Sequence, residues 1–436
     1  MTHSTHRSRG RRWLPAPVAI GLIAISMLFP TTSQAAHEPR DMVLEWNINA
    51  VNAISNAPDA ATPGLGQPPP LAPIHLAMVH GAIYDAVMAI VDTHEPYLDG
   101  LNARRSSSQA AAVAAAAHGV LVGLSSAAPN VKASVDGLYE KSLAKIRNGT
   151  AERRGIAVGK AAAAAMLAER VGDGRFGTYA FRVGTQPGEW RPVPPANANT
   201  FGWVSLVKPF TLRRADQYRI GAPYALTSAA YAREFNEVKR LGGTTSTRTP
   251  EQARIASWAS VNPFSMINSG LRDIAKKRHL STSQQARLFV MTSMSTADSL
   301  IACWENKDHW NFWRPQTAIR LADTDGNPAT VADPTWTSLI GNPGYPEPPS
   351  GFNCLVSGAM NAARAYFGTN RMKFSLTSVG ASPVTRDYTR FSGPIADAIE
   401  GRVLVGIHFR RGDVQGAWLG GKVARYLASH YFERED

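Results

Sequence analysis

Helix-forming segments recur along the whole chain, whereas the period-two alternation of apolar and polar residues that marks β-strands is scarce. Ala, Leu, Met, Glu and Lys dominate these segments, and all five have high helix propensity. Alanine-rich runs at 110–117 and 161–165 favour closely packed helices. The sequence therefore predicts an all-α fold of helical bundles. The predicted helices span residues 41–54, 74–91, 108–121, 131–146, 151–170, 216–241, 251–260, 282–306, 353–366, 393–407 and 413–431.

The chain has 436 residues, which is enough for two helical domains or one large fused unit. The Gly- and Thr-rich run at 242–247 is the best candidate boundary, because Pro250 follows where a helix should begin and Thr249 can cap it. We therefore expect an N-terminal helical region at 37–242 and a C-terminal helical domain at 243–436.

Residues 1–36 have the pattern of a bacterial export signal. Four arginines precede an apolar run at 17–29, and Ser33-Gln34-Ala35 offers a cleavage site. The stretch at 11–14 also resembles a twin-arginine signal, so ordinary secretion and export after folding both stay open. The sequence predicts a periplasmic or secreted protein with no membrane anchor once the signal is cleaved, and it carries no signal for an oligomeric state.

The chain is basic, with 46 Lys and Arg against 33 Asp and Glu and a net charge of +13. Loss of residues 1–36 removes four arginines and no acids, which leaves +9. The excess is spread along the chain without a dense basic run or interleaved aromatics, so we expect no nucleic-acid partner. A diffuse positive field can still steer small anions towards a cleft.

Three short motifs in the C-terminal half point to an oxyanion site. Lys307 and Arg314 are seven residues apart, a spacing that places both cations on one helical face, and Pro315 bends the chain after them. Ser350-Gly351 is a tight turn that opens a helix, where backbone N–H groups and the helix dipole favour anions.

The third motif is Arg402 followed six residues later by His408. On a straight helix their side chains would lie about 120° apart, so they converge only if the helix ends, which Gly406 permits. Asp413 is near enough in sequence to orient the second ring nitrogen of His408. Each motif alone is also consistent with ordinary packing or a solvated face, and only their joint occurrence in this order is specific.

The ordered set K-x6-R-P, P-S-G and R-x5-H resembles the signature of the vanadium-dependent haloperoxidases and the related type-2 phosphatidic acid phosphatases. Two longer phrases, NFWRPQTAIR at 311–320 and LAMVHGAIYDAV at 76–87, resemble the bacterial haloperoxidase branch. This resemblance covers most of the chain after residue 36. It implies a fold of helical bundles, a vanadate cofactor whose place phosphate can take, and hydrogen peroxide with a halide, or a small organic or phosphate compound, as substrates.

The resemblance also implies a role for each motif residue. Lys307, Arg314 and Arg402 would neutralise the vanadate or phosphate oxygens, and Ser350 with the Gly351 N–H would donate hydrogen bonds to them. His408 would bind vanadium, or attack phosphorus in a phosphatase. Trp304 and Tyr345 fall where haloperoxidases place aromatic side chains near the halide.

Phe352 departs from the family pattern, which has an acid–base histidine directly after P-S-G. Phenylalanine cannot move a proton, and general acid–base catalysis contributes about 10²–10⁴ in rate. We therefore expect bromide or iodide oxidation to be retained better than chloride oxidation. Two alternatives stay open: a phosphatase with His408 as its nucleophile, and an oxyanion-binding homologue with impaired catalysis.

The chain has two cysteines, Cys303 and Cys354. Each lies four residues from a motif residue, Lys307 and Ser350, so the two sulfurs should be close if both motifs line one pocket. An exported protein meets an oxidising compartment, which favours a disulfide between them. The alternative is two buried free thiols.

Overall fold

A computed structural model describes residues 39–55, 63–195, 198–380 and 382–435. The predicted signal peptide at 1–36 lies outside these residues. Glu38–Asp436 forms one compact unit, which is described by itself below. The boundary predicted at 242 and 243 stays a prediction, and within this unit helices from both sides of it pack directly against each other.

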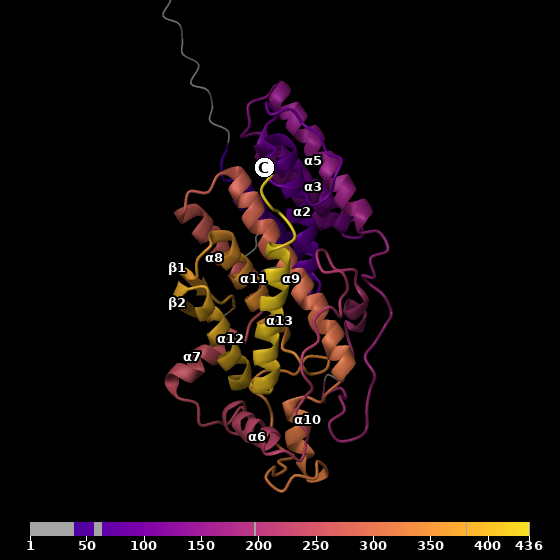
Figure 1. The fold of residues 1–436 in the computed structure, drawn as a ribbon, viewed down its shortest axis with the longest axis vertical. Helices are drawn as coiled ribbons and strands as arrows, with labels where there is room; N and C mark the ends of the chain where they lie inside the picture. The colour runs from indigo at the N-terminus through magenta and orange to yellow at the C-terminus, as the bar shows by residue number, and fades with distance from the viewer. Residues whose placement is uncertain (1–38, 56–62, 196–197, 381, 436) are drawn as a thin grey trace, which may run out of the picture. The chain divides into compact units, whose positions relative to one another are not determined.

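The predicted all-α fold is confirmed, since thirteen α-helices and one two-stranded sheet make up the regular structure of the described residues (Figure 1). Five α-helices lie before residue 200: α1 (Met42–Ser55), α2 (Ala72–Val91), α3 (Gln109–Leu124), α4 (Pro129–Leu143) and α5 (Thr150–Glu169). The later helices are α6 (Ala229–Leu241), α7 (Pro250–Ala259), α8 (Pro263–Lys277), α9 (Thr282–Trp310), α10 (Pro315–Arg320), α11 (Gly351–Phe367), α12 (Ser392–Leu404) and α13 (Arg410–Ala428). Two short 3₁₀ helices, η1 (Gly202–Leu206) and η2 (Ala322–Thr324), lie in the connections.

The 29-residue helix α9 is the centre of the fold. It packs against α2 from the N-terminal half and against α11 and α13 from the C-terminal half, and these helices lie side by side in Figure 1. Most of its residues are buried, including every residue from 288 to 304. Because α9 touches both halves, its C-terminal turn, which carries Lys307, is held from several sides.

Helix α6 is shorter than predicted. The sequence predicted a helix over 216–241, but α6 begins only at Ala229. Gly221 and Pro223 lie in the missing part, and proline disfavours helix in the residue before it as well as removing a backbone N–H. Ser228 then accepts a hydrogen bond from the backbone N–H of Tyr231 and caps the helix.

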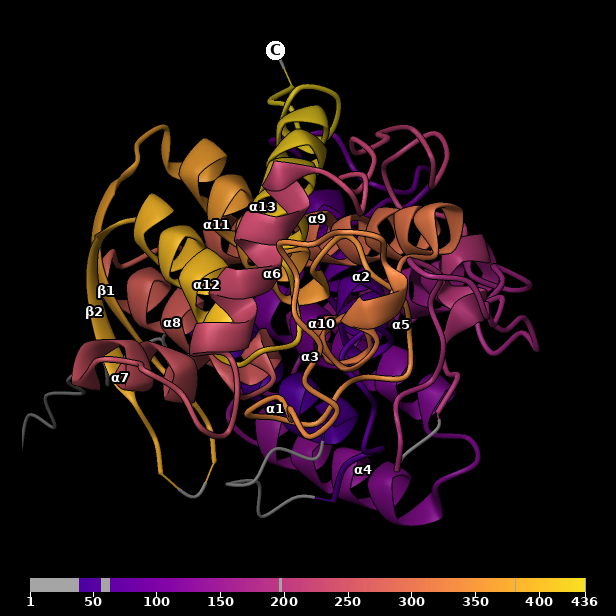
Figure 2. The same cartoon turned by 90° about the horizontal axis from the view of Figure 1, so that it is seen from below.

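Three elements were missed altogether: helix α8, the short helix α10, and a hairpin of β1 (Arg371–Thr377) and β2 (Thr385–Arg390). Alternate residues of β1 are buried, namely Met372, Phe374 and Leu376, so a period-two pattern was present over one short segment. The hairpin lies at one edge of the molecule beside α8 (Figure 2).

Helix α2 is long and apolar enough to cross a membrane by composition alone, although the sequence pointed to no such segment after residue 36. In this structure 89% of its apolar window is buried inside the protein. Its two histidines, His75 and His80, are buried among core residues.

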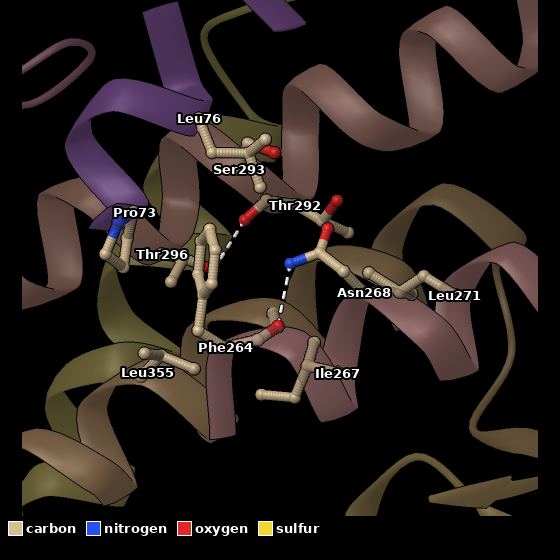
Figure 3. A pocket seen from close by; sticks show the side chains of 11 residues that line it. Pro73, Leu76, Phe264, Ile267, Asn268, Leu271, Thr292, Ser293, Thr296 and Leu355 are labelled. Carbon is tan, nitrogen blue, oxygen red and sulfur yellow. Dashed lines mark hydrogen bonds between the residues drawn. The ribbon is translucent and has the colours of Figure 1, made fainter. Parts of the chain in front are cut away.

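A small cavity lies between α2, α8, α9 and α11, and Figure 3 shows its lining. Its polar side chains are satisfied locally: Thr296 donates to the carbonyl oxygen of Thr292 at 2.6 Å, and Asn268 donates to that of Phe264 at 2.9 Å. With a volume of about 10 Å³, it has room for about one water molecule. It is a packing defect in the core, away from the three motifs.

The close approach of α3 and α5 gives a stability prediction. A Cβ added at Gly159 of α5 would lie 2.3 Å from the carbonyl oxygen of Ala112, whereas a Cβ at Gly137 of α4 would meet nothing within 4 Å. We expect Gly159→Ala to lower the free energy of unfolding by about 1–3 kcal/mol through overpacking. Gly137→Ala should raise it by about 0.5–1 kcal/mol through helix propensity. Urea denaturation of both variants checks this, and equal effects would contradict the predicted packing.

Candidate oxyanion site

Lys307 and Arg314 come together at the C-terminal end of α9, but not by helical periodicity. The interpretation that both lie on one helical face is wrong, because α9 ends at Trp310 and Asn311 adopts a left-handed conformation with φ of 44°. Arg314 instead stands directly before α10, in extended backbone. Both side chains are fully buried and reach the same carbonyl oxygen of Pro346, at 2.8 Å from Lys307 Nζ and 3.4 Å from Arg314 Nη2.

His408 reaches the site because α12 ends early, as the sequence analysis required. The helix stops at Leu404, and Gly406 has φ of +81°. A Cβ at Gly406 would lie 2.2 Å from the carbonyl oxygen of Gly242, so close packing requires glycine there as well. Arg314 Nη1 donates to the carbonyl oxygen of Ile407 at 2.8 Å and lies 3.4 Å from both ring nitrogens of His408.

Glu347 is the site residue that the sequence analysis missed. It is 1% exposed, and its Oε1 lies 2.7 Å from Nδ1 of His408. Its Oε2 lies 3.9 Å from both Lys307 Nζ and Arg314 Nη1. Two backbone hydrogen bonds with Phe312 hold it in place. An acidic residue three positions before Ser350, in a proline-rich loop, was the available signal.

The charges of this cluster follow from burial and from its neighbours. Burial lowers the pKa of His408 to about 3 against the opposing effect of Glu347, and Arg314 lowers it further. Burial alone would raise the pKa of Glu347, but His408, Arg314 and Lys307 together bring it down to about 2. Burial also lowers the pKa of Lys307. At neutral pH the cluster therefore contains a carboxylate at Glu347 and a neutral imidazole at His408.

Ser350 and Asp413 form a second group beside this cluster. Asn353 donates to Ser350 Oγ at 3.1 Å and to Asp413 Oδ1 at 2.8 Å. Burial and the nearby carboxylate of Glu347 raise the pKa of Asp413 well above its usual value. Asp413 was predicted to orient His408, but in this structure the carboxylate that contacts Nδ1 of His408 belongs to Glu347.

Gly351 begins helix α11, and Ser350 is its N-cap residue without a side-chain capping hydrogen bond. The first backbone N–H groups of a helix have no partner within the helix, and the helix dipole adds positive potential there. The turn predicted at Ser350-Gly351 is therefore present, and it faces the same part of the fold as the buried cations.

Arg402, the third predicted cation, lines a cavity together with Tyr345. Its Nη1 donates to the carbonyl oxygen of Ala259 at 2.6 Å, and its guanidinium carbon lies 4.9 Å from the ring centre of Phe352. Its buried Nε has no hydrogen-bond partner among the described residues. Burial lowers the pKa of Arg402 to about 10. A partly buried cation whose Nε has no partner is suited to an additional anionic contact.

A cavity of about 190 Å³ opens beside Arg402 and is lined by Trp304, Tyr345, Gly351 and Phe352, among others. The rings of Trp304 and Tyr345 lie 4.9 Å apart, and Lys307 Nζ is 5.7 Å and 5.3 Å from their centres. The two aromatic residues predicted on the halide side thus form one wall of this cavity. Phe352, where the family pattern has histidine, packs edge-on against Trp258.

The disulfide predicted between Cys303 and Cys354 is absent, and both residues are buried free thiols. The Cys303 thiol donates to the carbonyl oxygen of Pro349 at 3.6 Å. Burial and a hydrogen bond with Cys303 raise the pKa of Cys354. The two motifs do bring the sulfurs together, but as free thiols in hydrogen-bonding contact.

The described residues fit a tetrahedral oxyanion such as vanadate or phosphate. Lys307 and Arg314 are buried and Arg402 is partly buried, and none has a carboxylate within hydrogen-bond distance among the described residues. The N-terminus of α11 supplies backbone N–H groups. Oε1 of Glu347 lies 2.7 Å from Nδ1 of His408, which favours the neutral tautomer with its proton on Nδ1. In that tautomer Nε2 carries no proton and can act as a ligand atom or a nucleophile. Fixed cations and N–H donors in a dry site stabilise oxyanions strongly.

Comparison with known proteins agrees with the all-helical fold. Residues 287–434 match the family model of the VCPO second helical-bundle domain. The fold is similar to a structure described as the first bacterial vanadium-dependent iodoperoxidase, with 21% identity, a TM-score of 0.72 and coverage of 91% of this chain and 96% of that chain. It is also similar to a holo-type bacterial vanadium-dependent chloroperoxidase, with 17% identity, a TM-score of 0.69 and coverage of 88% and 96%. No curated protein matches the chain.

The chain therefore has an all-helical fold similar to that of solved bacterial vanadium-dependent haloperoxidases. Its residues 287–434 match the family model of one domain of that fold, the VCPO second helical-bundle domain.

The neutral state of buried His408 gives a prediction about stability and pH. Its pKa is about 3 in the folded protein against 6.5 as the ordinary value, so unfolding takes up one proton between these pH values and stability falls as pH falls. We expect His408→Gln to reduce the slope of unfolding free energy against pH by about 1.4 kcal/mol per pH unit between about pH 5 and 6. Exposed His309, changed to Gln, is the control. Equal slopes for wild type and His408→Gln would contradict the assignment.

Proposed function

We propose that this chain is a vanadate-dependent haloperoxidase-like enzyme that oxidises bromide or iodide, in preference to chloride, with hydrogen peroxide. The observation that carries the proposal is the buried cluster of Lys307, Arg314 and His408 around Glu347, beside the uncapped start of α11. This cluster has the residue types and the charge that an oxyanion cofactor requires.

Vanadate, when bound, would supply an electrophilic centre that activates hydrogen peroxide. Overall, peroxide, halide and one proton would give hypohalous acid and water. Lys307, Arg314 and Arg402 would hold the negative charge of the cofactor, and Ser350 with the Gly351 N–H would donate hydrogen bonds to it. Trp304 and Tyr345 exclude water from one wall of the adjoining cavity, where a halide or a small organic substrate would enter.

A phosphatase is the second candidate function, and the neutral state of the His408 imidazole favours it. A nucleophilic histidine must be neutral, and a carboxylate at its other ring nitrogen stabilises the positive charge that develops on attack. His408 and Glu347 have this arrangement. The absence of an acid–base group at Phe352 weakens this candidate for alkyl phosphates, whose leaving group needs a proton.

We further propose that the protein is exported to the periplasm or secreted. The support is the basic start, the short apolar run and the cleavage pattern within residues 1–36.

Vanadate-dependent bromination is the direct test. We expect protein incubated with orthovanadate to brominate phenol red in the presence of peroxide and bromide. Lys307→Ala and His408→Ala should each lose about 10²-fold or more in rate, because each removes a group that holds the charge of the cofactor. Glu140→Gln, at an exposed position on α4, is the control. Hydrolysis of an aryl phosphate that vanadate inhibits would select the phosphatase instead, and tight vanadate binding with neither activity would indicate a binding protein.

Restoring the histidine of the family pattern tests the role of Phe352. We expect Phe352→His to raise kcat by about 10–10² in the bromination assay, because it returns a group that can move a proton. Phe352→Leu removes the ring without adding such a group and serves as the matched control. A gain of the same size in both variants, or no gain in Phe352→His, would show that acid–base chemistry at this position does not limit the rate.

A further inference from the structure

Glu347 places a negative charge inside a site whose other features attract anions. Its Oε1 lies 2.7 Å from Nδ1 of His408, and Oε2 has no comparable neighbour. Neither oxygen has a hydrogen bond of good geometry among the described residues, although both are fully buried. The nearest cations, Lys307 and Arg314, lie 3.9 Å away, beyond hydrogen-bond distance. A buried carboxylate oxygen without a donor is costly, because it has lost its water and gained nothing equivalent.

In this structure the neighbouring cations direct donors to backbone carbonyl oxygens and not to this oxygen. Lys307 Nζ donates to the carbonyl oxygens of Pro346 and Pro349, at 2.8 Å and 2.6 Å. Arg314 donates through Nε to Tyr345 and through Nη1 to Ile407, at 2.9 Å and 2.8 Å. The donors that remain on Lys307 and Arg314 are available to a bound anion, and that anion can supply the donor that Oε2 lacks.

Any oxyanion that touches Lys307, Arg314 and His408 lies beside Glu347, because all three are within 3.9 Å of its carboxylate. A fully deprotonated oxygen in that place would face another negative charge at short range. An oxygen that carries a proton would instead donate a strong, charge-assisted hydrogen bond to Oε2. Glu347 thus favours a ligand with at least one acidic proton.

We propose that Glu347 makes this site selective for protonated tetrahedral oxyanions, such as hydrogen phosphate or hydrogen vanadate, and that it excludes sulfate. Sulfate has the same shape and a similar size, but it has no proton to donate at neutral pH. The inference rests on the proposed function, since it assumes that Lys307, Arg314 and His408 receive an oxyanion. It adds to that function a selectivity for oxyanions that carry a proton.

Calorimetric binding of inorganic phosphate and of sodium sulfate, at pH 7 and constant ionic strength, tests the proposal without any assay of turnover. We expect wild-type protein to bind phosphate at least about tenfold more tightly than sulfate, because a like charge at contact costs several kcal/mol. Glu347→Gln replaces the charged acceptor with an amide that can also donate, so its preference for phosphate over sulfate should fall about tenfold or more. Glu140→Gln should keep the wild-type preference.

The outcomes separate this inference from the function on which it rests. If wild-type protein binds both anions equally, or if Glu347→Gln keeps the preference for phosphate, the selectivity role of Glu347 is overturned and the oxyanion site stands. If wild-type protein binds neither phosphate nor orthovanadate, the proposed function and this inference both fail. The wild-type comparison alone decides the question if Glu347→Gln does not fold, which circular dichroism would show.

Discussion

The burial of charge at one point is the constraint on which the rest of the site depends. Lys307 and Arg314 are fully buried within reach of the same carbonyl oxygen, and removing two like charges from water is expensive. The loop at 345–349 offsets this cost. Three of its five residues are prolines, which offer carbonyl acceptors but no N–H donors. Such a loop can surround cations with oxygen atoms and leave no backbone donor unsatisfied at those positions.

The same loop explains why the cluster holds its shape. Backbone hydrogen bonds between Glu347 and Phe312 tie it to the segment that follows α9, and the backbone N–H of Ser350 donates to the carbonyl oxygen of Gly412 near the start of α13. Segments at the ends of three helices are thereby joined at one place. A site built in this way is rigid before a ligand arrives, which is what strong electrostatic stabilisation of an anion requires.

Sequence reasoning succeeded where the information was local. Most helices, the cap at Thr249, the turn at Ser350 and the break at Gly406 follow from residue type and spacing, and the structure has them all. It failed where several segments act on one another. Nothing local to Glu347 says that its carboxylate meets His408, and the seven-residue spacing of Lys307 and Arg314 suggested a helical face where the chain in fact turns at Asn311. Likewise, the positions of Cys303 and Cys354 beside two motifs predicted that the sulfurs lie close together. They did not decide between a disulfide and two free thiols.

Phenylalanine at position 352 changes the packing around Arg402 and also removes a side chain that could transfer a proton. Its ring packs against Trp258, and the guanidinium carbon of Arg402 lies 4.9 Å from the ring centre, so this position now offers Arg402 a cation–π contact. The site still contains two carboxyl groups with opposite tendencies, since the pKa of Asp413 is raised and that of Glu347 is lowered. Environments that push two pKa values apart divide the roles of proton donor and acceptor between them. The polar side of this site therefore retains groups that can hold and accept a proton, while the side at Phe352 has become apolar.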